Sequence, residues 1–226
     1  APAAITDPVI RRSGSGEAAR DNPSFLDAAA AASGFVNPAL AGLATRAGPL
    51  VFQFPPLGRR LLTDIPRLAA RIAAFLTMLP RPHGPGRPPI YAVEFRDPQL
   101  VDPLVARLLM DAGAVPCLAV HARMPPVAEQ AAAFMVDRAD CTLPLVVRWN
   151  LHAGRQYEEA RSDYFPFDRL VEEDVATRQQ LGRLARAAAA AGRDVFITIN
   201  NKAEGSAPCS VAALAEVIAA PPSDGG

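Results

Sequence analysis

The residues best suited to chemistry lie near the ends of five short apolar runs. Glu94 and Arg96 are two positions apart in the run 90–96, so in an extended strand their side chains point to the same side. A carboxyl group enclosed there can act as a general acid or base, and a neighbouring guanidinium stabilises its charged form. Glu94 and Arg96 are therefore the candidate catalytic residues.

Each of the other runs also carries polar residues near its carboxyl end. These residues are Gln53 in 50–54, His121 in 114–122, Arg148 and Asn150 in 144–150, and Thr198 and Asn200 in 193–200. Guanidinium groups hold phosphate or carboxylate groups, and amides orient hydroxyls or carbonyls. Asn201 and Lys202, just beyond the last run, extend this set with an amide and a cation. The predicted ligand is small and polar or anionic, of a sugar- or phosphate-like kind.

The alternative is that these polar residues satisfy one another. Glu94 and Arg96 would then form an internal ion pair, and Lys202 would be a solvated loop lysine. Because buried charges are costly unless they are paired or used, five polar strand ends together favour a site. We expect Gln53, Glu94, Arg96, Arg148 and Asn200 to share one cavity.

Helices are predicted between the runs, which are predicted strands. Apolar residues at helical spacing indicate helices over 60–79, 98–112, 126–136, about 170–191 and 209–219. Apolar strands alternating with helices are typical of a parallel α/β fold. No phosphate-binding glycine motif follows a strand, so a TIM-type (β/α)8 barrel is favoured over a doubly wound sheet. The strands' carboxyl ends would meet at its mouth.

The remaining segments are predicted to be connections or shorter helices. Residues 1–22 are predicted to be a loop, 80–89 a proline-rich connection and 220–226 a flexible tail. Between them, a helix capped by Ser24 ends near Gly34, and a second begins at Asn37 and ends at Gly48. The chain is predicted to form one partial barrel domain over 1–226.

Composition narrows the function classes. The formal net charge of zero provides no wide basic field for nucleic acid. The cysteines Cys117, Cys141 and Cys209 are widely spaced, which supports neither a disulfide framework nor a zinc site. The three histidines lack clustered carboxylate partners, so we expect no metal and no cofactor. No uninterrupted apolar run of membrane-spanning length and no signal peptide is present. We expect a cytoplasmic bacterial protein.

Four motifs together resemble the YecE-like family, also called domain of unknown function 72. They are GPLVFQFPP (48–56), YAVEFRDP (91–98), VVRWN (146–150) and ITINNKAEGSAP (197–208). The resemblance covers about residues 48–215 and implies an eight-stranded TIM barrel whose activity is not established. Carried over by motif, the implied site residues are Gln53, Glu94, Arg96, Arg148, Asn200 and Asn201.

The chain departs from the family pattern near the implied site. Lys202 stands where the family has a histidine, and His152 is a candidate substitute for it. Trp149 and Asn150 replace the usual Leu-His, and Cys209 begins a segment that departs from the family's "NA". Because of these changes, the ligand specificity of the family is not carried over to this chain.

The beginning of the chain resembles the segment after the family's third strand. On that alignment of APAAIT (1–6), three strands lie upstream and about five parallel strands with their helices remain. We therefore expect a truncated gene product or fragment whose open sheet edges promote self-association and poor solubility.

Three function hypotheses follow. The leading one is an enzyme acting on a small polar or anionic metabolite at the barrel mouth. A nucleic-acid processing or binding barrel is the alternative suggested by arginine richness, and the neutral charge disfavours it. The third is a non-catalytic ligand-binding or degraded relative.

Overall fold

Two compact units make up the chain in the computed structural model. The structure describes residues 1–10, 20–82 and 88–220. Unit 1 covers Ala1–Cys117 and unit 2 covers Leu118–Gly226. The parallel strands follow the order β3-β4-β5-β6-β7, and the boundary between the units falls inside β5 (Ala114–Val120). The described residues therefore have an α/β fold, and closure into an eight-stranded barrel remains a prediction.

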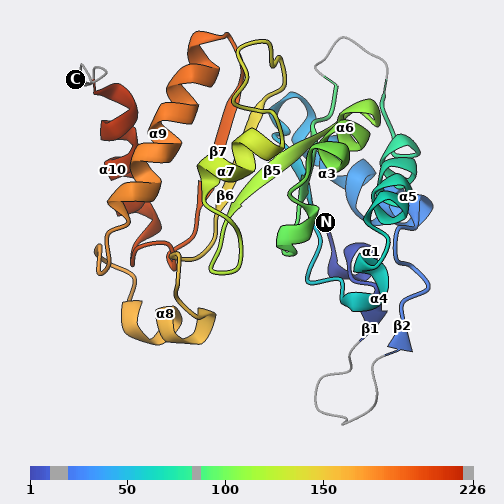
Figure 1. Cartoon of the computed structure of the whole chain (residues 1–226), viewed down its shortest axis with the longest axis horizontal. Coiled ribbons are helices and arrows are strands. Elements are labelled where there is room, and N and C mark those ends of the chain that lie inside the picture. The colour runs from blue at the N-terminus through green and yellow to red at the C-terminus, as the bar shows by residue number, and fades with distance from the viewer. Residues whose placement is uncertain (11–19, 83–87, 221–226) are drawn as a thin grey trace. The chain divides into compact units, whose positions relative to one another are not determined.

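The elements of unit 1 form part of the parallel sheet, a separate pair of antiparallel strands and the helices around them (Figure 1). They are α1 (Ala3–Thr6), β1 (Val9–Ile10), β2 (Arg20–Asp21), α2 (Ala28–Ala31), η1 (Ala32–Val36), α3 (Asn37–Leu43), η2 (Ala44–Arg46), β3 (Leu50–Gln53), α4 (Arg59–Leu62), α5 (Ile65–Thr77), β4 (Tyr91–Glu94), η3 (Pro98–Leu100), α6 (Pro103–Asp111) and the first part of β5. β3 pairs with β4 from Leu50 opposite Tyr91 to Gln53 opposite Glu94. The carboxyl ends of β3 and β4 therefore lie side by side and carry the predicted polar residues Gln53 and Glu94.

Aromatic side chains pack on one face of this sheet. The rings of Phe52 and Phe75 lie 5.5 Å apart, and Phe52 also contacts Tyr91 at 6.0 Å, both edge to face. Phe54 packs against Phe95 at 5.7 Å. Because successive strand residues alternate between faces, this core leaves Gln53 and its neighbours of the same parity on the other face.

The elements of unit 2 surround the strands β6 and β7 and the end of β5. They are α7 (Val127–Ala133), β6 (Leu145–Trp149), α8 (Tyr157–Tyr164), α9 (Val175–Ala190), β7 (Val195–Ile199) and α10 (Ala207–Ala219). α9 and α10 lie side by side next to β7 (Figure 1). β6 and β7 run parallel, with Arg148 opposite Thr198.

Aspartate side chains cap the first turns of several helices and fix where these helices begin. The Asp64 side chain accepts from the Arg67 N–H at 3.0 Å at the start of α5, and Asp102 accepts from the Leu104 N–H at 2.7 Å before α6. Asp174 caps α9 in the same way, by accepting from the Thr177 N–H at 3.0 Å. Each carboxylate satisfies an N–H group that has no partner within its helix.

Two predictions for the amino-terminal part were wrong. Residues 1–22 contain α1, β1 and β2 rather than only a loop, because the Asn22 side-chain amide donates to the Ala4 and Asp7 carbonyls, both at 2.7 Å. The helix capped by Asp27, not Ser24, does not end near Gly34. It continues through the π-helical turn η1, whose wider hydrogen bonding accommodates Pro38.

The helical run Ala28–Arg46 is long and apolar enough, by length and composition alone, to cross a membrane. Only 11% of its most apolar window is buried. Ala31 and Val36 are buried, and the Phe35 ring packs edge to face on Phe52 at 5.5 Å. These contacts attach the run to the sheet of unit 1.

The other predicted elements are found with shifted ends. The helix predicted over 60–79 divides into α4 and α5, and the one over 98–112 into η3 and α6. The long connection after β6 contains α8, which was not predicted. Residues 83–87 of the proline-rich connection and 221–226 of the tail lie outside the described residues.

Candidate functional site

The structure brings Gln53, Glu94 and Arg96 together in unit 1. The Arg96 guanidinium lies 2.6 Å from the Glu94 carboxylate and 3.4 Å from the Gln53 side-chain oxygen. The Glu94 side chain is fully buried, and that of Arg96 is 10% exposed. The predicted same-side arrangement of Glu94 and Arg96 is therefore present.

This group is a buried ion pair with an amide beside it. The guanidinium balances the charge of the enclosed carboxylate, as the alternative of an internal ion pair requires. An enclosed carboxylate next to a donor can also exchange a proton with a bound group. The catalytic roles of Glu94 and Arg96 remain a prediction.

Asp97 supports this group, although the sequence analysis did not single it out. Its buried carboxylate accepts from the Leu57 N–H at 2.8 Å. This bond ties the loop after β3 to the loop after β4. The signal was present in the sequence, because Asp97 directly follows Arg96 in YAVEFRDP.

A second group of predicted residues lies at the strand ends of unit 2. The Asn150 N–H donates to the Val120 carbonyl at 3.1 Å, and the Asn200 N–H donates to the Trp149 carbonyl at 2.8 Å. The carboxyl ends of β5, β6 and β7 are therefore neighbours (Figure 1). His121, directly after β5, lies at the same end.

Arg148 and Asn150 share one face of β6. The Asn150 side-chain amide donates to the Arg148 carbonyl at 3.2 Å, and both side chains are half-buried. Trp149 lies on the opposite face and has no exposed surface. Trp149, which replaces the family's leucine, is thus a core residue, whereas Arg148 and Asn150 lie on the polar face of β6.

The loop after β7 uses its asparagines partly for its own structure. The Asn200 side-chain oxygen accepts from the Lys202 N–H at 3.0 Å, and the Asn201 oxygen accepts from the Ala207 N–H at 2.9 Å. Asn201 thereby closes the loop onto the first turn of α10. The Lys202 ammonium lies 4.5 Å from the centroid of the Tyr157 ring, which is a cation–π contact, and Lys202 is half-buried.

Glu204 and Gly205 hold this loop, and the sequence analysis missed both roles. The fully buried Glu204 carboxylate accepts from the Asp174 N–H at 2.7 Å and lies 2.7 Å from the Arg178 guanidinium. Gly205 has a φ of +120°, and a Cβ there would lie 2.5 Å from the Arg169 carbonyl oxygen. Only glycine fits this close approach. Both residues belong to the AEGSAP part of the last motif.

Glu172 is the centre of a further charged network in unit 2. Its carboxylate accepts from Arg155 at 2.7 Å and from the Tyr164 hydroxyl at 2.8 Å, and the His152 ring lies 3.9 Å away. These hydrogen bonds, that of Arg155 first, lower the pKa of Glu172 below its usual value. Burial, followed by the bond to Glu172, raises the pKa of the Tyr164 hydroxyl.

His152 is placed by this network and by the loop after β7. The His152 backbone N–H donates to the Lys202 carbonyl at 2.9 Å, and the Nδ1 atom of its ring lies 2.7 Å from the Ala153 carbonyl oxygen. His152 thus lies close to the residue that stands where the family has a histidine. Its role as a substitute for that histidine remains a prediction.

The described residues contain no group of three or more His, Cys, Asp and Glu side chains that could hold a metal ion. Cys117, Cys141 and Cys209 form no disulfide bond within the described part of the chain, and Cys117 is a buried residue of β5. Among the charged candidate residues, Arg96 is paired with the Glu94 carboxylate, whereas the Lys202 ammonium contacts the Tyr157 ring.

The contacts described fall into two groups, one within each unit, and a cavity shared by all five predicted residues remains a prediction. Gln53, Glu94 and Arg96 form the first, and the ends of β5, β6 and β7 carry the second. No curated protein and no solved structure matches the chain. A family model described as "Protein of unknown function DUF72" matches residues 12–224, and the chain therefore belongs to this family.

Proposed function

We propose that this protein binds a small polar or anionic ligand, of a sugar- or phosphate-like kind, at the carboxyl ends of β5, β6 and β7. The observation that carries the proposal is the adjacency of these ends through the Asn150–Val120 and Asn200–Trp149 backbone hydrogen bonds. Parallel α/β proteins build their ligand sites at this end of their strands.

The side chains at these ends supply complementary chemistry. Arg148 provides a guanidinium, whose fork of N–H groups fits the oxygens of phosphate or carboxylate. The amides of Asn150 and Asn200 can both donate and accept, which suits hydroxyl groups. Lys202 adds a cation to the adjoining loop. This combination favours a ligand that carries both an anionic group and hydroxyls.

Glu94 and Arg96 of unit 1 are proposed as a separate acid–base pair. Proton transfer requires a carboxyl group shielded from water and a partner that stabilises its anionic form. The buried Glu94 and its contact of 2.6 Å with Arg96 support this role. The ligand-binding proposal for unit 2 does not depend on it.

The test is the thermal stability of the full chain with and without inorganic phosphate or glucose 6-phosphate. A ligand at 100 times its Kd stabilises the folded state by about 2.7 kcal/mol, which raises the Tm by roughly 5–10 °C for a chain of this size. The Arg148→Ala variant should lose this rise. The matched control is Arg183→Ala, which removes an exposed arginine of α9.

Circular dichroism first establishes that each variant folds. A wild-type Tm unmoved by glucose 6-phosphate and by phosphate would contradict the proposal. So would an Arg148→Ala protein that retains the full ligand-induced rise.

A further inference from the structure

We propose that the outer face of α8 is a second binding site, which takes the sugar rings of a neutral oligosaccharide. Tyr157 and Arg161 are four residues apart on α8, and Phe165, four residues further on, directly follows its last residue, so the three form a row that ends just beyond the helix. With a rise of 1.5 Å per residue, the row is about 12 Å long. Tyr157 is 52% exposed and Phe165 is 74% exposed.

A hollow lies beside this row. It measures about 440 Å³ and is lined by Glu158, Arg161, Ser162, Phe165 and Phe167. Small-molecule sites in proteins commonly occupy about 300–1,000 Å³ and combine aromatic walls with a few polar groups. The hollow beside α8 has a volume in this range and a lining of two phenylalanines and three polar residues, and it is open to solvent, with Tyr157 outside its lining.

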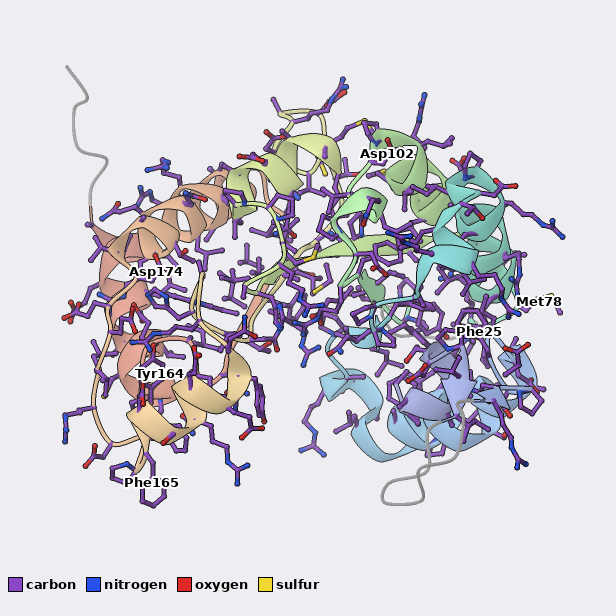
Figure 2. The ribbon with its side chains drawn as sticks, turned by 60° about the horizontal axis from the view of Figure 1, so that its bottom comes forward. Phe25, Met78, Asp102, Tyr164, Phe165 and Asp174 are labelled. Atoms are coloured by element: carbon purple, nitrogen blue, oxygen red, sulfur yellow. The ribbon has the colours of Figure 1, made fainter. Side chains whose placement is uncertain are left out.

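The aromatic rings of this site are held in place by the rest of unit 2. Phe167 packs edge to face against Phe165, with ring centroids 6.1 Å apart and an interplanar angle of 82°. Phe167 also packs on the buried cluster that contains Leu151 and Tyr164. Figure 2 shows Tyr164 among the ribbons and the Phe165 ring pointing away from them. The exposed Phe165 ring thus packs on a half-buried ring, which in turn packs on a buried cluster.

Tyr157 at the other end of the row is also supported. The Lys202 ammonium lies 4.5 Å from its ring centroid, and such cation–π contacts restrict the ring. A ligand that meets positioned rings loses less of its binding energy to their ordering than one that meets mobile side chains.

The chemistry of the row fits a sugar ring. One face of a pyranose carries C–H groups that stack on an aromatic ring, and its edge carries hydroxyls that both donate and accept. Arg161 supplies donors, Glu158 supplies acceptors and Ser162 supplies both. Arg161 and Glu158 are 3.5 Å apart and largely exposed, so their weak mutual attraction competes little with a hydroxyl.

Charge favours a neutral ligand over an anionic one. Glu158 lies beside Arg161, and Glu159 and Asp163 add further negative charge to α8. A phosphate-rich partner such as single-stranded nucleic acid also stacks on aromatic rings, but it needs a positive groove for its backbone. Arg161 and Lys202 add positive charge here, but Arg161 lies next to a carboxylate and Asp163 is paired with another arginine, so the charges of this surface largely balance and do not form a positive groove.

The experiment measures binding of cellotetraose and maltotetraose to the full chain by calorimetry and by saturation-transfer NMR. We expect wild-type protein to bind at least one of them. Phe165→Ala and Tyr157→Ala should each weaken that binding at least ten-fold, whereas Phe165→Trp should preserve it. The matched control is Met78→Ala, because Met78 is also 74% exposed but lies in unit 1 and is labelled in Figure 2.

Three results would overturn the inference. The first is that wild-type protein binds neither tetrasaccharide, and the second is that Phe165→Ala binds as wild type does. The third is binding of an eight-residue thymidine oligonucleotide in place of the sugars. Arg148→Ala should leave tetrasaccharide binding unchanged, which separates this site from the one proposed at the strand ends.

Discussion

Glu94 is a buried carboxylate whose charge is balanced by a neighbouring guanidinium. Its carboxylate has no exposed surface and lies 2.6 Å from Arg96, which is itself 10% exposed. A buried pair of this kind contributes little compared with a well-packed apolar pair, but removal of one partner leaves the other charge enclosed and uncompensated. The loss of stability on substitution of Glu94 therefore depends on whether the Arg96 charge stays buried without its partner.

We accordingly expect Glu94→Gln to lower the free energy of unfolding by about 3–5 kcal/mol. Guanidinium unfolding monitored by circular dichroism measures this change. The control is Glu216→Gln, at an exposed position of α10, which should leave the unfolding curve where it is. The double variant Glu94→Gln, Arg96→Met should recover part of the loss, because the enclosed positive charge is gone. Equal losses in the single and double variants would show that the ion pair is not the cause.

Other residues show which site features can be predicted from sequence. Strand parity correctly placed Gln53, Glu94 and Arg96 together, because side chains two apart share a face whatever the fold. Parity says nothing of loops, where Asn201 uses its oxygen to hold the start of α10. The role of Glu204 depends on a contact with the start of α9, 30 residues earlier in the chain, and no local pattern encodes it.

Among the elements, the apolar strands and amphipathic helices were predicted, whereas α8 was not. Strands β3 to β7 each contain a run of apolar residues, which predicts a strand. β4, β5 and β6 are largely buried, whereas the residues of β7 are half-buried or exposed. α8 carries mainly charged and polar residues, so it lacks the periodic apolar face on which a prediction depends. A capping box formed by Gln156 and Glu159 begins it.

The network around Glu172 joins α8 to the segment before α9 and predicts a response to acid. The folded-state pKa of Glu172 is lowered by Arg155 and Tyr164, so the carboxylate binds protons less readily in the folded than in the unfolded chain. Its stabilising effect is present above the unfolded pKa of about 4.3 and is lost as the pH falls through the lower folded pKa.

Thermal unfolding of wild type and Glu172→Gln, measured from neutral to acidic pH, checks this response. We expect Glu172→Gln to be less stable at neutral pH and to lose less additional stability as the pH falls below about 4.3. Glu129→Gln, at an exposed position of α7, serves as control and should retain the wild-type pH dependence. Parallel pH curves for wild type and Glu172→Gln would contradict the assignment.

At the scale of the whole molecule, the order of the strands leaves two of them at the ends of the sheet. β3 and β7 each pair with a single strand among the described residues. Strand–helix alternation predicted parallel pairing, and the sequential order that the structure shows is the usual one for such strands. Closure of a barrel depends on the number and tilt of all its strands, and no local sequence pattern determines these.

The outer edge of β7 predicts self-association. Asp194 and Asn200 direct backbone groups to β6, so the alternate residues Val195, Ile197 and Ile199 direct theirs outward. The strand VFITI carries no charge, and the chain as a whole has a formal net charge of zero. Neither the charged side chains that usually protect an edge nor repulsion between copies opposes pairing with a second copy.

Sedimentation velocity across a wide range of protein concentrations tests this expectation. The wild-type sedimentation coefficient should rise with concentration, and Thr198→Lys, which places a charge at an exposed position of β7, should suppress the rise. Thr142→Lys adds the same charge at an exposed loop position in the same unit and should not. If the wild type sediments as a monomer throughout, or if both lysine variants behave alike, the edge of β7 is not where copies of the chain meet. A selective effect of Thr198→Lys instead assigns the association to backbone pairing along β7, since net charge changes equally in the two variants.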